Sequence, residues 1–167
     1  MNKQKKGSIH KNFLTSVKVT KLFIILVAVA SVVICILGPR IVRMVALESK
    51  EGVFESPWLT GFSRFWVLIV LGYICAIILF VMLYQLYILV SRIDAGEVFS
   101  VQNVRSLKII SDIVLIACLI TFIMGVTCGY FILFVCASTA FMTAIIRVVM
   151  NAFSKAVEMK DELDYTV

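Results

Sequence analysis

The chain has 167 residues, the length of one domain. Hydrophobic residues make up 62% of it, compared with roughly half in soluble domains, and its mean hydropathy is +1.06. Only 16% of the residues are charged, so a water-soluble fold has too little polar surface to cover so large an apolar interior. The composition therefore predicts an all-α protein that spans a membrane.

Residues 1–21 are predicted to form a basic, solvated tail that contains six lysines. The uncharged run between Lys21 and Arg40 has 18 residues, enough to cross a hydrocarbon core of about 30 Å as a helix. A first span is therefore predicted over 22–38, and Pro39 is expected to end or kink it. Because no small-x-small cleavage site follows, we interpret this run as a retained span rather than a signal peptide.

The second span is predicted over 65–90, an uncharged run of 26 residues. A further 38 residues, 109–146, contain only one charge, and a single helix of that length would reach about 57 Å. This run must therefore fold back, which predicts a third span over 109–124 and a fourth over 130–150. The turn is expected at Gly125 to Tyr130, although Gly125 and Gly129 also form a G-x-x-x-G helix-packing pattern.

Residues 91–108 form a polar segment between the second and third spans, which we call the elbow. Gly96 is predicted to close the preceding helix in the left-handed conformation, and Ser100 to cap the next helix through its hydroxyl. Phe99 and Val104 then occupy the two positions of a hydrophobic staple. Asn103 stands where Glu or Gln would complete a capping box, so that box is predicted to be only partial.

Two stretches carry a family resemblance. Residues 96–107 read GEVFSVQNVRSL, and residues 156–167 read AVEMKDELDYTV. The first resembles the Gly-Glu-x-Phe-Ser-x-x-Asn-x-x-x-Leu pattern of a bacterial membrane family called domain of unknown function 2975. The second is similar to that family's acidic tail, with Tyr165 in place of the usual leucine and Leu163 in place of a usually polar residue. In length, helix count and motif order the likeness extends over nearly the whole chain, and it implies a small four-helix membrane protein.

The distribution of Lys and Arg predicts the orientation. Twelve of the 16 basic residues lie in the N-terminal tail, the elbow or the end of the chain, and four lie in or beside the first loop. The positive-inside rule then places both termini in the cytoplasm. We therefore expect a multi-pass, four-helix bundle over residues 22–150 in the bacterial cytoplasmic membrane, followed by a charged cytoplasmic tail at 151–167.

Asp112 and Arg147 are the charges predicted to lie closest to the apolar core, each about one turn from the cytoplasmic end of its helix. They are predicted to form an intramembrane ion pair, with Lys108 as an alternative partner for Asp112. A structural pair and a proton- or ligand-linked role both remain open at this point.

Small residues recur at helical spacing on each span and are predicted to face the centre of the bundle. They are Ala28, Ser31, Cys35 and Gly38; Gly72 and Ala76; Ala117, Thr121 and Gly125; and Cys136, Ala140 and Ala144. The five cysteines form no C-x-x-C pair, and we interpret them as small apolar packing residues. No cofactor or metal site is predicted from these spacings.

The chain has no nucleophile–base pair and no Gly-rich phosphate loop, so an enzyme is not expected. A small transporter or channel-like subunit that uses Asp112 and Arg147 is the second hypothesis. The first is a regulatory or interaction protein, since the family resemblance implies a neighbouring small helix-turn-helix DNA-binding regulator as its cytosolic partner. Homo-oligomers are possible, and direct nucleic-acid binding is not expected. The predicted partner-binding residues are Gly96, Phe99, Ser100, Asn103, Arg105, Lys108, Glu158, Glu162 and Asp164.

Overall fold

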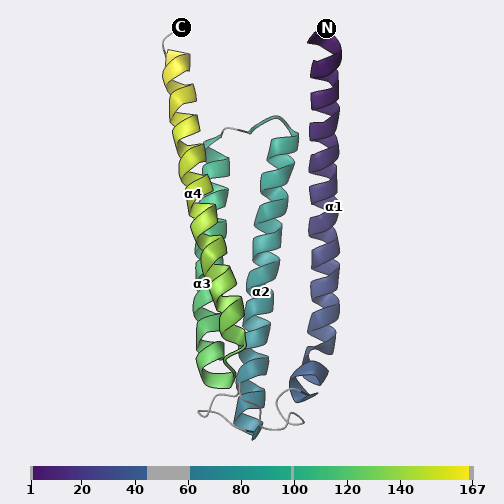
Figure 1. Cartoon of the computed structure of the whole chain (residues 1–167), viewed down its shortest axis with the longest axis vertical. Helices are drawn as coiled ribbons and strands as arrows, with labels where there is room; N and C mark the ends of the chain where they lie inside the picture. Colours follow the sequence, from purple (N-terminus) through teal and green to yellow (C-terminus); the bar gives the residue numbers. More distant parts are fainter. Residues whose placement is uncertain (1, 45–60, 99, 166–167) are drawn as a thin grey trace.

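The computed structural model describes residues 2–44, 61–98 and 100–165, and this part of the chain is all-α. Its helices are α1 (Asn2–Arg43), α2 (Gly61–Asp94), α3 (Val101–Cys128) and α4 (Ile132–Tyr165). Successive helices run in opposite directions, and the amino-terminal end of α1 and the carboxy-terminal end of α4 both lie at the elbow end of the molecule (Figure 1).

Each helix contains a segment long and apolar enough to cross a membrane. These segments are Ser16–Arg43, Phe62–Asp94, Val101–Cys128 and Ile132–Lys160. All four carry large apolar side chains that are exposed, such as Leu22, Ile77 and Phe134. The predicted number of membrane-length helices, four, is confirmed, and the helices extend beyond most of the predicted limits of the spans. Charge spacing marks only the stretch that crosses the hydrocarbon, whereas a helix can continue into the polar region on either side.

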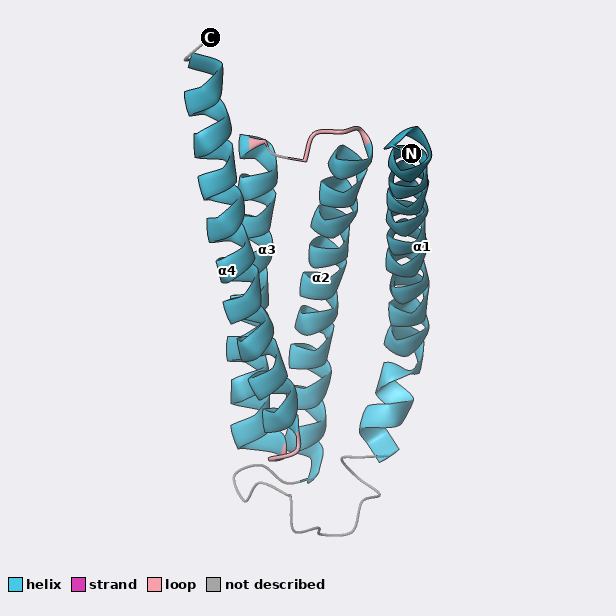
Figure 2. Ribbon diagram, turned by 45° about the horizontal axis from the view of Figure 1, so that its top comes forward, coloured by secondary structure: helices cyan, strands magenta, loops and turns pink. Residues whose placement is uncertain are grey.

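The helices pack in chain order as an open row. α2 lies between α1 and α3, and α4 packs on α3. Within the described residues, the backbone of α1 does not come close to that of α3 or α4, and both views show α1 beside α2 at the edge of the row (Figures 1 and 2). The predicted bundle is therefore not closed around a common centre. Lipid solvates apolar helix faces, so no hydrophobic driving force requires α1 to close against α4.

Three buried clusters hold the row together. At the elbow end, Val17 and Ile24 of α1 pack with Leu83 and Val90 of α2. A second cluster joins α2 to α3 through Leu89, Leu107, Ile110 and Val114, with α4 side chains against it. At the opposite end, Leu68 and Cys128 are buried together, with Val42 and Ile132 packed around them. Each helix is thus fixed to its neighbour in the chain.

The small-residue faces of α1, α2 and α3 are confirmed as buried or half-buried. On α4 the prediction is wrong for Ala140 and Ala144, which are exposed, whereas Thr143 is buried. The contact face of α4 instead passes through Cys136, Thr139 and Thr143. Its three- and four-residue steps alternate and so keep to one side of the helix, and Ala140 and Ala144 lie off this line.

The glycine pattern at the α3–α4 turn separates into two roles. Gly125 lies inside α3 and is buried, and a Cβ placed on it would lie 2.6 Å from Leu133 Cδ2. Gly129 follows the end of α3, and its carbonyl accepts a 3.1 Å hydrogen bond from Ile132 N. The turn therefore falls where the sequence predicts it, while Gly125 is a helix-packing residue.

α1 continues through Pro39 to Arg43, and its ribbon bends near that end (Figure 1). A proline removes one backbone hydrogen bond and clashes with the preceding turn, which produces a bend of this kind. Of the two outcomes predicted at Pro39, the structure shows the kink.

Candidate functional site

The elbow begins with a tightly closed helix end. α2 ends at Asp94, and Gly96 has φ +90°, a conformation that glycine adopts without steric cost. Gly96 N donates to Ile93 O at 3.1 Å, and Glu97 N donates to Arg92 O at 3.1 Å. These two bonds form a Schellman motif, which satisfies carbonyls that a helix end otherwise leaves free. The prediction that Gly96 closes this helix is confirmed.

The next helix begins at the predicted cap. Ser100 has an extended backbone, with φ −133° and ψ 147°, and its hydroxyl accepts a 3.3 Å hydrogen bond from Asn103 N. This contact satisfies one of the free amides in the first turn of α3. The hydrophobic staple predicted between Phe99 and Val104 is not described by the structure, because Phe99 lies outside the described residues.

Asn103 does more than the partial capping box predicted. It is fully buried, and its Nδ2 donates to Glu97 O at 2.5 Å and to Val98 O at 3.0 Å. One amide group therefore holds two successive carbonyls of the elbow backbone. Backbone carbonyls need a hydrogen-bond partner, and Asn103 provides one for both carbonyls only when the loop has this conformation. Asn103 therefore fixes the course of the chain between α2 and α3. It is not a surface contact residue in this structure.

Arg92 makes a second bridge across the elbow. Its Nη1 donates to Gln102 O at 3.3 Å and to Ser106 Oγ at 3.2 Å. Ser106 is buried, and the contact with Arg92 gives its hydroxyl the hydrogen-bond partner that a buried polar group needs. The last turn of α2 and the first turns of α3 are thus tied by side chains on both sides of the loop.

The elbow is also tied to α1. Lys21 Nζ lies 2.6 Å from Asp94 Oδ2, and these side chains are 24% and 30% exposed. The two residues are 73 positions apart, and nothing in the spacing of charges along the chain indicates that they meet. This ion pair fixes the position of α1 beside the helix end that carries Gly96.

Breaking this ion pair is expected to have a small, measurable effect. Asp94→Asn should lower the free energy of unfolding by about 0.5–1 kcal/mol, because the pair is partly exposed to solvent. Unfolding of the purified protein in mixed detergent micelles provides the measurement, with Glu97→Gln as the control for loss of an exposed carboxylate. The reversed pair Lys21→Asp with Asp94→Lys should recover most of the loss, and an equal loss in Glu97→Gln would contradict the assignment.

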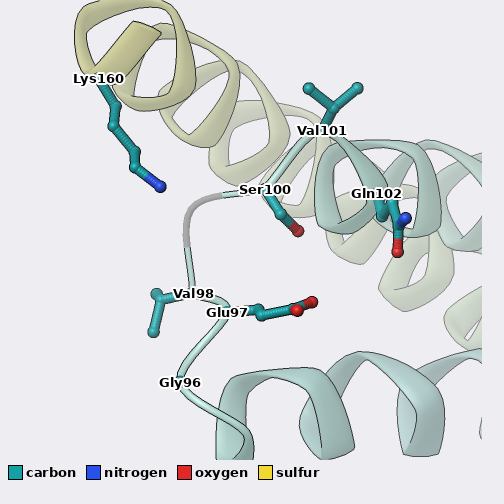
Figure 3. A pocket seen from close by; sticks show the side chains of 7 residues that line it. All are labelled: Gly96, Glu97, Val98, Ser100, Val101, Gln102 and Lys160. Carbon is teal, nitrogen blue, oxygen red and sulfur yellow. The ribbon is translucent and has the colours of Figure 1, made fainter. Parts of the chain in front are cut away.

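An open cleft of about 660 Å³ lies between the elbow and α4. Its lining residues are Gly96, Glu97, Val98, Ser100, Val101, Gln102 and Lys160. In Figure 3 the Lys160 side chain extends from α4 toward the elbow, whereas the Glu97 and Ser100 side chains extend from the elbow on the side away from Lys160. The side chains that line the cleft thus include one basic and one acidic group. Its volume is in the range of ordinary ligand pockets.

The structure separates the predicted partner-binding residues into groups. Gly96 and Ser100 line the cleft, and Asn103 positions its backbone from inside. Four others are exposed but do not line it: Arg105, Lys108, Glu158 and Glu162. Phe99 and the side chain of Asp164 lie outside the described residues. Lys160 was not among the predicted residues. It is recognised as part of the site only because the structure places it beside the elbow, in the lining of the cleft.

Asp112 and Arg147 are not brought together. Both are exposed, and no salt bridge joins them in the part of the chain that the structure describes. Arg147 Nε instead donates to Ser111 Oγ at 3.4 Å, and Ser111 is buried between α3 and α4. Ser111 and Asp112 are adjacent in α3, so their side chains project about 100° apart around the helix axis. Arg147 therefore contacts the side of α3 that carries Ser111, and Asp112 projects from a different side of that helix.

The described residues contain no group of three or more His, Cys, Asp or Glu side chains placed to hold a metal ion. Besides the four membrane-length helices, the described residues form the cleft at the elbow end and a smaller, apolar pocket of about 220 Å³ between α1 and α2.

Together these features define a small multi-pass α-helical membrane protein. Residues 58–167, which are 110 of the 167, match the family described as a protein of unknown function (DUF2975). The chain belongs to this family. The match covers α2, the elbow, α3 and α4, and it is narrower than the near whole-chain likeness expected from the motifs, because it leaves out α1. No curated protein and no solved structure matches the chain.

Proposed function

We propose that this protein is a non-enzymatic membrane docking protein, and that a soluble cytosolic partner binds at the cleft between the elbow and α4. The observation that carries the proposal is the cleft itself. It joins Gly96, Glu97 and Ser100 of the family's motif to Lys160, about 60 residues further along the chain, on one open surface. Two segments that the sequence treats as separate motifs thereby become parts of one site.

The cytoplasmic orientation is part of the proposal. The amino-terminal end of α1 and the carboxy-terminal end of α4, which both lie at the elbow end of the molecule, are rich in charge, and most of the basic residues lie on that side. The positive-inside rule places such an end in the cytoplasm of a bacterial cell.

The partner class follows from the family resemblance, which implies a small helix-turn-helix DNA-binding regulator. α4 presents the Lys160 amine to the cleft, and a carboxylate or carbonyl of the partner is expected to accept a hydrogen bond from it. Binding there would hold the regulator at the membrane.

The test is co-purification from native membranes with the tag on the N-terminus. We expect a helix-turn-helix protein to be retained by the full chain and lost when residues 155–167 are deleted. Lys160→Glu should weaken binding of the purified partner at least about tenfold, equivalent to about 1.4 kcal/mol. Lys155→Glu makes the same charge change on the same helix outside the cleft and should bind normally.

Equal weakening by Lys155→Glu and Lys160→Glu would mean that general charge, and not the cleft, determines binding. Retention of the partner by the truncated chain would refute the proposed site.

A further inference from the structure

The α3–α4 interface contains a pair of thiols in direct contact. Cys118 Sγ and Cys136 Sγ lie 3.7 Å apart, although the residues are 18 positions apart in the sequence. Each sulfur also lies 3.6 Å from the backbone carbonyl of the other cysteine. The two thiols are therefore held between the helices in a reciprocal arrangement. This arrangement has no counterpart among the other cysteines of the described residues.

The residues around the pair repeat the same pattern on both helices. Cys118 is followed three positions later by Thr121, and Cys136 is followed three positions later by Thr139. Thr121 Oγ1 donates to Cys118 O at 3.0 Å, and Thr139 Oγ1 donates to Cys136 O at 2.9 Å. Each hydroxyl is thus bound to the carbonyl that faces the opposite thiol. The surroundings of the two sulfurs are accordingly fixed on both helices.

The position of the pair limits what can react with it. Cys118 lies ten residues before the end of α3, about 15 Å along the helix, so the pair lies well inside the span. A water-soluble disulfide reaches only the polar surface of the membrane and does not contact sulfurs at this depth, so it does not exchange with the pair. An oxidant for this pair must therefore dissolve in the bilayer.

We propose that Cys118 and Cys136 are a redox pair that a bilayer-soluble quinone oxidises to a disulfide, which ties α3 to α4. Two S–H bonds break and one S–S bond forms, and both hydrogens with their two electrons pass to the quinone, which leaves as the quinol. The sulfurs must approach by roughly 1.7 Å to reach a bond length of about 2.05 Å. The dithiol and the disulfide are both uncharged, so either state is compatible with the membrane interior.

The experiment uses the full chain in membrane vesicles. Vesicles are treated with a short-chain quinone, quenched in acid and denatured, and the free thiols are alkylated and mapped by peptide mass spectrometry. The number of alkylated cysteines should fall from five to three, with a single disulfide-linked peptide pair that contains Cys118 and Cys136. Oxidised glutathione, which does not enter the bilayer, should leave all five cysteines alkylated.

Two matched variants complete the test. Cys118→Ala should keep its four remaining thiols after quinone treatment, whereas Cys75→Ala, which removes another thiol from a span, should still lose two. The proposal would be overturned if all five cysteines of the unaltered chain were still alkylated after quinone treatment. A disulfide that involves Cys35, Cys75 or Cys128 would also overturn it. The measurement reads the thiols directly, so its outcome is independent of whether the cleft binds a partner.

Discussion

Asn103→Asp is expected to lower the free energy of unfolding by about 2–4 kcal/mol, one of the two largest effects that the structure predicts for a single substitution. Asparagine and aspartate have nearly the same shape, so the change removes the Nδ2 donor without creating a cavity. The carbonyls of Glu97 and Val98, whose hydrogen bonds to Asn103 are partly buried, then lose their shared partner, and a buried polar group left unsatisfied costs about 1–3 kcal/mol. The carboxylate oxygen would also face two carbonyl oxygens.

Asn103→Ala should lose the same hydrogen bonds without adding charge and is expected to be destabilised somewhat less. Unfolding in mixed micelles, followed by circular dichroism, measures both variants. Gln102→Ala is the matched control, because Gln102 is adjacent and exposed, and only its backbone carbonyl takes part in the Arg92 contact. If Asn103→Asp were as stable as Gln102→Ala, the elbow backbone would not depend on this side chain.

The elbow also shows which features a sequence predicts well. Gly96 and Ser100 were predicted correctly because a helix end and a helix cap are determined by residues within one turn of each other. The number of membrane-length helices was predicted correctly because membrane thickness sets a minimum length for an uncharged run. Both kinds of signal are local.

The helix arrangement was predicted less well, and the reason is physical. In a membrane helix the face that touches lipid and the face that touches another helix are both apolar, so hydrophobic periodicity does not distinguish them. The open row and the exposure of Ala140 therefore had no sequence signal.

Contacts between distant segments were also missed. The Lys21–Asp94 ion pair and the position of Lys160 beside the elbow depend on how the helices align, which single-residue patterns do not encode. The Cys118–Cys136 contact did have a signal, namely the repeated Cys-x-x-Thr spacing on two consecutive spans. That spacing gains its meaning only when the two spans are known to be neighbours.

Gly125→Ala is expected to lower the free energy of unfolding by about 1–3 kcal/mol, the cost of inserting a methyl group into a filled helix interface. The new Cβ would lie 2.6 Å from Leu133 Cδ2, 2.8 Å from Leu133 Cγ and 3.1 Å from Leu133 N. The side-chain end can move, but the backbone nitrogen of α4 follows only if the helices separate near the turn. A separation there also disturbs Cys128, which is almost completely buried beside this turn.

The matched control is Gly72→Ala, because Gly72 also lies inside a span and a Cβ on it meets no atom within 4 Å. Both substitutions gain the preference of alanine over glycine in a helix, about 1 kcal/mol, so their difference isolates the contact with Leu133. We expect Gly72→Ala to be neutral or stabilising under the same micelle unfolding conditions. Leu133→Ala combined with Gly125→Ala should recover stability relative to the sum of the single changes, since the smaller side chain makes room for the added methyl group. Additive losses in the double variant would mean that α3 and α4 do not meet at this point, and the alignment that brings Cys118 to Cys136 would then have to be revised.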